Sequence, residues 1–168
     1  NNSAQADIYL FVDGGSVTDF VAKGGRLDGG GSANAQFYCL ASSSGDIGAI
    51  DVSDMKLNNA ARGLYIHSTG AGSAIGDVTV SGVKSRSIIG ENIFTLADNS
   101  GSFSKVTFKG NNTDGGTYGL RSSGVASVYT DGMNDLGTHS TLQRSISSAT
   151  TVRVGADIGI SLVPTQAT

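Results

Sequence analysis

Hydrophobic and polar residues alternate in short runs that recur through the middle of this chain at a constant interval. Ile50-Asp51-Val52, Val78-Thr79-Val80 and Val106-Thr107-Phe108 share one apolar-polar-apolar pattern and are evenly spaced along the sequence. Such alternation is typical of a β-strand with one buried face. The period of about 28 residues lies in the range that indicates a solenoid, in which each unit buries its apolar face against its neighbours.

A second set of apolar runs repeats in the same phase and ends each time in a small polar turn. These runs are Phe37–Leu40, Tyr65–Ile66, Ile93–Phe94 and Tyr118–Leu120, and the turns that come after them are ASSSG, HSTGAG, ADNSG and RSSG. β-Branched and aromatic residues dominate the runs, while Glu and Pro each occur once, which favours strands over helices. We therefore predict an all-β fold, a right-handed parallel β-helix of about five rungs stacked about 4.8 Å apart.

The repeat also predicts a domain organisation. The expected rungs span roughly residues 17–44, 45–72, 73–101, 102–124 and 125–146. We assign residues 1–146 to the β-helix. Residues 147–168 form a C-terminal non-repeat β segment, because the alternation from Thr151 to Val163 breaks the period. This segment is expected to act as a cap or as an intersubunit sheet.

Two inward columns and several charge pairs follow from the same register. The inward columns are Ile50/Val78/Val106 and Val52/Val80/Phe108. A shift by one period places Asp28 over Lys56, Asp77 over Lys105 and Arg86 over Asp114, and the shorter period expected near the end places Lys109 over Asp131. Opposite charges that face each other across a ladder stabilise it modestly, whereas the expected Lys56 over Lys84 opposes it.

Composition limits the classes of partner. The chain has 168 residues, of which 38% are hydrophobic and 15% charged, which suits one domain with one core and a surface of low charge. The net charge of −3 and the lack of a Lys/Arg cluster along the sequence predict no nucleic-acid partner. No apolar run approaches the roughly 18 residues of a membrane span, so we expect no membrane insertion.

The N-terminal sequence lacks the basic region and long apolar stretch of a signal peptide. We interpret the chain as a mature protein, a processed piece or an excised domain.

The single cysteine, Cys39, lies between Tyr38 and Leu40, and we interpret it as a buried small apolar residue rather than a reactive or metal-binding thiol. Residues 70–76, GAGSAIG, precede a strand pattern, which favours a turn over a dinucleotide-binding loop.

Other short motifs carry little chemistry. Asp46, Asp51 and Asp54 offer oxygen ligands for Ca²⁺, but acidic residues near turns more often cap the turn or face solvent. We therefore predict no metal and no cofactor. Asn111 begins an Asn-x-Thr sequence, which fits a glycosylation acceptor in a eukaryotic secretory host.

The strand motifs carry a resemblance to a known superfamily. Val78–Lys84 (VTVSGVK), Val106–Asn112 (VTFKGNN) and Gly63–Gly70 (GLYIHSTG), with their Gly/Ser/Asn turns, resemble the right-handed parallel β-helix superfamily that includes pectate lyases and phage tailspikes. The resemblance covers about residues 17–146. Low charge, few rungs and the lack of an intrachain disulfide make the chain most similar to a phage tailspike or tail-fibre segment.

The resemblance implies a receptor-binding domain in a phage tail or at a bacterial surface. Its partner would be a bacterial surface polysaccharide, and whether it also depolymerises that polysaccharide stays open. The resemblance also implies a homotrimer. The apolar strands expected at residues 8–12 and 158–163 agree with this, because open strand edges need partners. The alternative is a purely structural trimeric shaft or virion appendage that binds no ligand.

Candidate catalytic residues are few. Glycoside hydrolysis takes two carboxyl groups about 5–5.5 Å apart for retention or about 6.5–9.5 Å apart for inversion. Asp114 and Asp135 come within one residue of register and form the best intrachain pair, although a role in turns competes with this interpretation. Asp51 is a weaker candidate, because Thr79 and Thr107 follow it in its column. The sequence leaves open whether the chain is a glycoside hydrolase, a lyase or no enzyme.

Candidate ligand-binding residues gather on one strand face. Strand alternation puts Tyr65 and His67 on the side opposite Leu64, and Arg121 falls near the column of His67 two rungs along. With Tyr118, these residues form a Tyr/His/Arg face suited to sugar rings and hydroxyls, and a solvated face without a ligand is the alternative. Because an outward position carries little core burial, Tyr65→Ala is expected to leave folding nearly intact.

Overall fold

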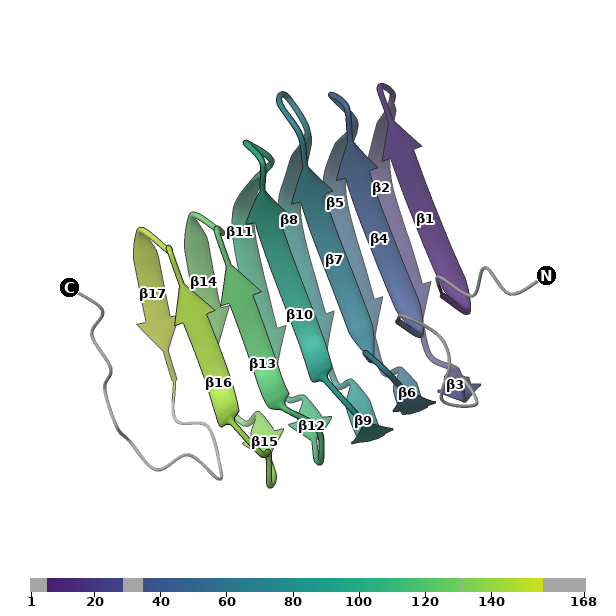
Figure 1. The fold of residues 1–168 in the computed structure, drawn as a ribbon, viewed down its shortest axis with the longest axis vertical. Coiled ribbons are helices and arrows are strands. Elements are labelled where there is room, and N and C mark those ends of the chain that lie inside the picture. The colour runs from purple at the N-terminus through teal and green to yellow at the C-terminus, as the bar shows by residue number, and fades with distance from the viewer. Residues whose placement is uncertain (1–5, 29–34, 131, 156–168) are drawn as a thin grey trace.

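The computed structural model describes residues 6–28, 35–130 and 132–155. These residues form a parallel β-solenoid of about five turns, in which every strand pairs in parallel with its neighbours (Figure 1). The described residues contain strands and turns and no helix. They accordingly include no helix that spans a membrane. The predicted all-β parallel solenoid is confirmed.

Three parallel sheets form the walls of the solenoid. Sheet A contains β1 (Ile8–Asp13), β4 (Phe37–Ser42), β7 (Leu64–Thr69), β10 (Glu91–Asp98), β13 (Tyr118–Ser123) and β16 (Leu142–Ser147), in that spatial order. Sheet B contains β2 (Ser16–Lys23), β5 (Asp46–Ser53), β8 (Ala74–Ser81), β11 (Ser102–Lys109), β14 (Ser127–Thr130) and β17 (Thr151–Val154). Sheet C contains β3 (Arg26–Asp28), β6 (Lys56–Ala60), β9 (Lys84–Ile88), β12 (Asn112–Thr113) and β15 (Asp135–Leu136). Sheets A and B are the two broad walls, and sheet C closes one edge between them (Figure 1).

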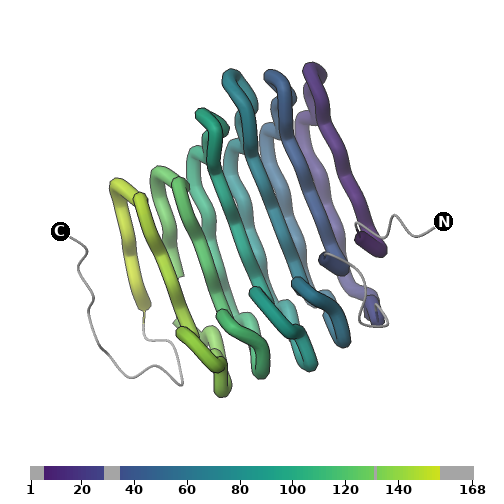
Figure 2. Tube along the Cα trace, viewed as in Figure 1, coloured from purple at the N-terminus to yellow at the C-terminus, as the bar shows by residue number. Residues whose placement is uncertain are grey.

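Each turn passes through sheet B, then sheet C, then sheet A, and Figure 2 shows the chain bending at the same corners in successive turns. The turns begin with β2, β5, β8, β11 and β14, which matches the phase predicted from the repeat. Each strand hydrogen-bonds only to the strands one turn before and one turn after it. Equivalent residues of successive turns therefore stay aligned. The last turns shorten mainly in sheet C, where β12 and β15 have 2 residues each.

The interior is filled by in-register columns of apolar side chains. The two predicted columns, Ile50/Val78/Val106 and Val52/Val80/Phe108, are aligned residue for residue across β5, β8 and β11, and all six side chains are buried. In each column, every side chain buries apolar surface against the equivalent side chains of the turns before and after it. This burial is the main source of stability in a solenoid. Cys39 belongs to the same core, as predicted, and its burial raises the pKa of its thiol to about 12.

The corner between sheets B and C repeats with the period of the sequence. Asp54, Gly82 and Gly110 adopt left-handed backbone conformations with φ of 55°, 62° and 58°. Glycine at two of these positions accepts this conformation without the steric penalty that a Cβ atom brings. The residue that follows is buried in each of these turns, and after Gly110 this residue is Asn111.

Asn111 uses its side-chain amide to hold this corner. Its Nδ2 donates to the Val80 carbonyl at 2.9 Å and to Asn134 Oδ1 at 3.0 Å, and its Oδ1 accepts from the Val83 N–H at 3.0 Å. Buried backbone groups that would otherwise lack partners are thereby satisfied. The predicted glycosylation acceptor is therefore wrong, because the Asn111 amide is buried and already bonded.

The charge register is confirmed in part. Asp77 faces Lys105, and their charged atoms lie 2.6 Å apart. The predicted Asp28 over Lys56 is wrong, because Lys56 faces Arg26 and Asp28 faces Asn58. The step from β3 to β6 is slightly longer than the repeat period, which shifts the pairing by two positions.

Other predicted charge contacts have different outcomes. The unfavourable Lys56 over Lys84 is present in the ladder between β6 and β9. Arg86 donates a hydrogen bond to the Asn112 side chain rather than to Asp114. The pair that includes Asp131 lies outside the described residues.

The repeat continues further towards the C-terminus than the sequence predicted. β17 pairs in parallel with β14, so the solenoid extends past the boundary expected at residue 146. The alternation that begins at Thr151 therefore belongs, at its start, to sheet B. Residues 156–168 of the predicted C-terminal segment lie outside the described residues.

The core columns give a direct prediction. Phe108 is fully buried and faces Val80 and Thr130, so Phe108→Ala should lower the free energy of unfolding by about 3–5 kcal/mol. Thr107→Ala, one residue away on the outer side, should cost much less. Urea unfolding of both variants measures the difference, and equal losses would contradict the inward assignment of Phe108.

Candidate functional site

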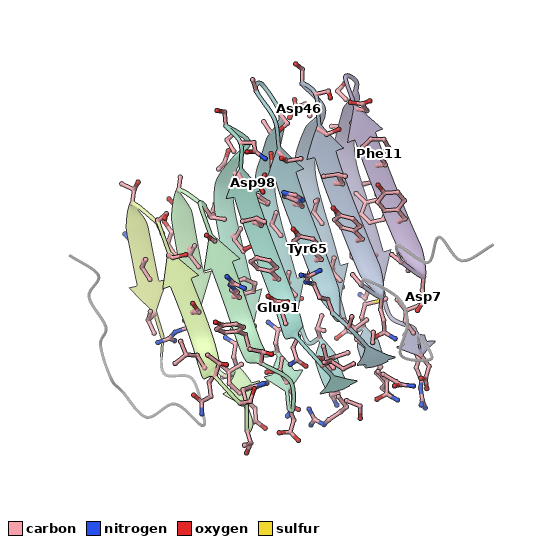
Figure 3. The ribbon with its side chains drawn as sticks, in the orientation of Figure 1. Asp7, Phe11, Asp46, Tyr65, Glu91 and Asp98 are labelled. Carbon is pink, nitrogen blue, oxygen red and sulfur yellow. The ribbon has the colours of Figure 1, made fainter. Side chains whose placement is uncertain are left out.

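A column of aromatic side chains crosses the outer face of sheet A. Tyr9, Tyr38, Tyr65 and Phe94 are aligned in register on β1, β4, β7 and β10, and Arg121 continues the column on β13. Neighbouring ring centroids lie 5.2, 4.8 and 5.0 Å apart along this column. Figure 3 shows Tyr65 on the broad face of sheet A. We call these residues, with the charged groups beside them, the sheet A face.

Strand alternation produces this face. In β7, Leu64 and Ile66 are buried in the core, whereas Tyr65 and His67 point outward and are half-buried. Because each turn returns the chain to sheet A in register, an outward aromatic residue meets the outward residue one turn later. An aromatic column therefore forms where successive turns carry an aromatic residue at the equivalent outward position.

The rings of the column cover one another. The planes of Tyr38 and Tyr65 are 4° apart, and those of Tyr65 and Phe94 are 5° apart. Ring faces inside the column are thus occupied, and the edges and hydroxyl groups are the parts left to contact a ligand. Burial raises the pKa of Tyr38 to about 12 and also raises the pKa of Tyr65, so both phenols are protonated at neutral pH.

This packing changes the expectation for Tyr65→Ala. The Tyr65 ring contacts Tyr38 on one side and Phe94 on the other, and the Arg62 guanidinium lies 5.2 Å from the ring centroid. Stacked aromatic pairs contribute roughly 0.5–1.5 kcal/mol beyond the area that they bury. We therefore expect Tyr65→Ala to destabilise the fold, so a milder substitution is needed to test binding.

Glu91 anchors one end of the face. Its carboxylate accepts hydrogen bonds from Arg62 Nε at 2.9 Å and from Arg121 Nη1 at 2.7 Å. The Arg121 guanidinium also lies 4.8 Å from the Phe94 centroid and 4.9 Å from the Tyr118 centroid. Burial alone would raise the pKa of Glu91, but the hydrogen bonds and charge of Arg62, with the hydrogen bond from Arg121, hold it below its usual value.

His67 anchors the other end. Its Nε2 lies 2.9 Å from Asp98 Oδ1, and its Nδ1 lies 3.3 Å from the Tyr38 hydroxyl. Since the Asp98 carboxylate only accepts, we assign the proton to Nε2, and Tyr38 then donates to Nδ1 in the neutral imidazole. Burial favours the protonated form of Asp98, but hydrogen bonds from Thr69 and His67 outweigh it and lower the pKa of Asp98.

All four predicted ligand-binding residues lie on this face. Tyr65, His67, Tyr118 and Arg121 occupy outward positions on β7 and β13, although Arg121 stands in the column of Tyr65 rather than that of His67. Whether they bind a ligand stays a prediction. The structure adds residues that the sequence reasoning did not select, namely Tyr38, Arg62, Glu91, Phe94 and Asp98. The available signal for Tyr38 and Phe94 was their position about one period before and after Tyr65.

The predicted catalytic residues lie apart: Asp135 is on sheet C, Asp114 directly follows β12 of that sheet, and Asp51 is on sheet B. Asp135 faces Asn112 and accepts a hydrogen bond of 2.7 Å from its side chain, and Asp114 accepts one of 2.9 Å from the Thr138 N–H. Asp51 is exposed on the outer side of sheet B, where it faces Thr79. The structure therefore does not bring Asp51 together with the other two, and each of those two accepts a hydrogen bond from a neighbouring turn.

The acidic residues of the sheet A face do not form a hydrolytic pair. Glu91 and Asp98 lie at opposite ends of β10, as Figure 3 shows, and the extended strand between them places them roughly 23 Å apart. Two-carboxyl glycoside hydrolysis takes less than about 10 Å. Protonated phenols, guanidinium groups and bonded carboxylates arranged on one broad face are suited to hold hydroxyl groups in place.

Comparisons with known proteins identify no relative. No protein-family model, no curated protein and no solved structure matches this chain.

The ion pairs at Glu91 give a pH prediction. The depressed pKa of Glu91 means that its contribution to stability is complete above the unfolded value of 4.5 and is lost as pH falls through the folded value. Glu91→Gln should therefore lower the free energy of unfolding by roughly 1.5–3 kcal/mol at neutral pH. The loss should shrink when urea unfolding is repeated near pH 3.

Asp77→Asn is the matched control, because Asp77 pairs with Lys105 on the exposed side of sheet B. Solvent screens such a pair, so the control should change stability little at either pH. A Glu91→Gln loss that is no larger than that of the control would contradict the anchoring role of Glu91.

Proposed function

We propose that this chain is a polysaccharide-recognising domain of the phage tailspike type, and that its ligand lies along the sheet A face. The observation that carries the proposal is the in-register column Tyr38, Tyr65 and Phe94, flanked by Arg121 and Glu91 at one end. His67 and Asp98 flank it at the other end. The face combines apolar ring edges with hydrogen-bond donors and acceptors. A sugar chain has matching groups, namely apolar C–H surfaces and hydroxyl groups.

Preorganisation supports binding at this face. The side chains of Arg62 and Arg121 are held by Glu91, and the His67 ring is held by Asp98 and by stacking 5.3 Å from Tyr65. Fixed side chains lose little conformational entropy when a ligand binds. A face of this kind is better prepared for a ligand than a surface of free, solvated side chains.

The solenoid also suits a polymer. Successive turns present equivalent outward positions about 4.8 Å apart along the axis, so a linear chain that follows the axis meets a similar set of groups at each turn. Tyr118 extends the face beyond Glu91, which it opposes in register. A repeating ligand gains more from such a surface than a single sugar does.

Assembly and location belong to the same proposal. We propose a homotrimer, carried on a virion tail or a cell surface, whose ligand is a bacterial surface polysaccharide. Tyr9 and Phe11 are 43% and 50% exposed on β1, which is the edge strand of sheet A within the described residues. Exposed aromatic residues on an edge strand favour a further contact there. Any hydrolysis of the polysaccharide would draw carboxylates from two chains.

A structural role is the second candidate. The rings of the column are stacked on one another, as expected where ring packing serves to stabilise successive turns. The outer side of sheet B carries the small polar column Thr79/Thr107, which suits a shaft that binds nothing. In this alternative the chain is a rigid appendage module without a ligand.

Tyr65→Phe tests the proposal, because it removes one hydroxyl and keeps the stacked ring. On an array of bacterial polysaccharides, the parent chain should bind at least one glycan. Tyr65→Phe should weaken that binding by about threefold to tenfold, the value of one hydrogen bond of roughly 0.5–1.5 kcal/mol. Thermal unfolding should show that the two proteins are equally stable.

Tyr129→Phe is the matched control, since Tyr129 is a half-buried tyrosine on sheet B beside Arg153. It should bind the glycan as the parent does. Equal weakening in both variants would remove the sheet A face as the binding site, and a parent that binds no glycan would favour the structural role.

A further inference from the structure

A shallow groove of about 290 Å³ runs along sheet C and is rich in positive charge. The side chains that line it are Arg26, Lys56, Leu57, Asn58, Lys84 and Arg86. Four of the 11 Lys and Arg residues of the chain thus gather in one place, although the chain as a whole carries a net charge of −3. We call this surface the sheet C groove.

The register concentrates the charge further. Arg26, Lys56 and Lys84 face one another in a single column across β3, β6 and β9. Parallel strands lie about 4.8 Å apart, so residues of like charge are direct neighbours across this ladder. Like charges that face each other across a ladder destabilise it. The same solenoid places an acidic partner opposite a lysine elsewhere, as in Asp77 and Lys105.

The protein neutralises only one end of this column, where Arg26 is paired with Asp28 at 3.0 Å. Arg86, which lies beside the column, donates hydrogen bonds to two neutral acceptors, the Ser85 carbonyl at 3.0 Å and the Asn112 side chain. Lys56 and Lys84 are exposed and form no ion pair with a described residue. Two adjacent ammonium groups in a groove are therefore available to an external anion.

We propose that the sheet C groove binds an acidic polysaccharide through its carboxylate or sulfate groups. Lys56 and Lys84 each contact one anionic group, and the sugar chain runs along the solenoid axis so that its charges follow the column of cations. The groove lies on a different sheet from the face proposed above. This inference stands independently of binding at sheet A.

The lining residues favour an acidic glycan over a nucleic acid. Single-stranded nucleic acids bind through aromatic side chains that stack on the bases, and the described lining of this groove contains none. A glycan with spaced anionic groups needs only the local cations.

The test compares two double variants that change the net charge equally. Lys56→Gln/Lys84→Gln removes the free cations of the groove, and Lys23→Gln/Lys105→Gln removes two lysines of sheet B. Binding is measured to dextran sulfate, alginate, neutral dextran and single-stranded poly(dT), each at low and high salt.

The parent should bind dextran sulfate or alginate, should not bind dextran, and should lose binding as salt increases. The groove variant should bind at least about tenfold more weakly at low salt, while the sheet B variant should stay close to the parent. Thermal unfolding of the free proteins adds a second readout, because removing like charges should leave the groove variant at least as stable as the parent.

Three results would overturn the proposal: no binding of either acidic polysaccharide, equal loss in both double variants, or tighter binding of poly(dT) than of the acidic polysaccharides. Tyr65→Phe in the same assay separates this site from the sheet A face. Unchanged binding of dextran sulfate by Tyr65→Phe supports a separate groove, whatever the outcome of the polysaccharide array.

Discussion

Every feature of this molecule depends on one constraint, the in-register pairing of each strand with the strand one turn away. Parallel pairing fixes the separation of equivalent residues at about 4.8 Å, so each side chain has its nearest long-range neighbours one turn before and one turn after it. Inside, this brings Val80 against Phe108, and both are completely buried. Outside, it brings Tyr38 against Tyr65. The constraint that builds the core therefore also builds the surface.

The same pairing stabilises the fold for some types of side chain and destabilises it for others. Stacked aromatic rings gain contact, and Asn111 and Asn134 satisfy each other and the backbone around them. Stacked lysines repel, as Lys56 and Lys84 must. In a structure held together by repetition, two facing lysines without an ion-pair partner call for an explanation. The sheet C groove is the place where this occurs among the described residues.

Much of the fold was predictable from the sequence because the constant period fixes both the strands and their phase. The columns through Val78 and Val80 follow from that phase alone. The charge register was less predictable, since one longer step between Arg26 and Lys56 moves each partner by two positions. Periodicity predicts which residues recur but does not predict where a corner gains or loses a residue.

The location of the sheet A face was predictable from the sequence, but the contacts between its side chains were not. Alternation in β7 was enough to place Tyr65 and His67 outside, and they are outside. The roles of Glu91 and Asp98 were not predictable, because each depends on side chains one turn away reaching the same point. The absence of a basic cluster along the sequence likewise did not predict the sheet C groove, because Arg26, Lys56 and Lys84 are each separated by a full turn and come together only in the fold.

The register itself is the central claim, and disulfide trapping tests it most directly. Thr79 and Thr107 face each other on the outer side of β8 and β11, at a Cα separation within the range of about 4.4–6.8 Å that a disulfide spans. Thr79→Cys/Thr107→Cys should form an intrachain disulfide readily under mild oxidation, and buried Cys39 should not compete. Thr79→Cys/Lys109→Cys, offset along the strand to roughly 8 Å, should not. Equal cross-linking of both pairs, or preference for the offset pair, would contradict the in-register solenoid on which both proposed binding surfaces depend.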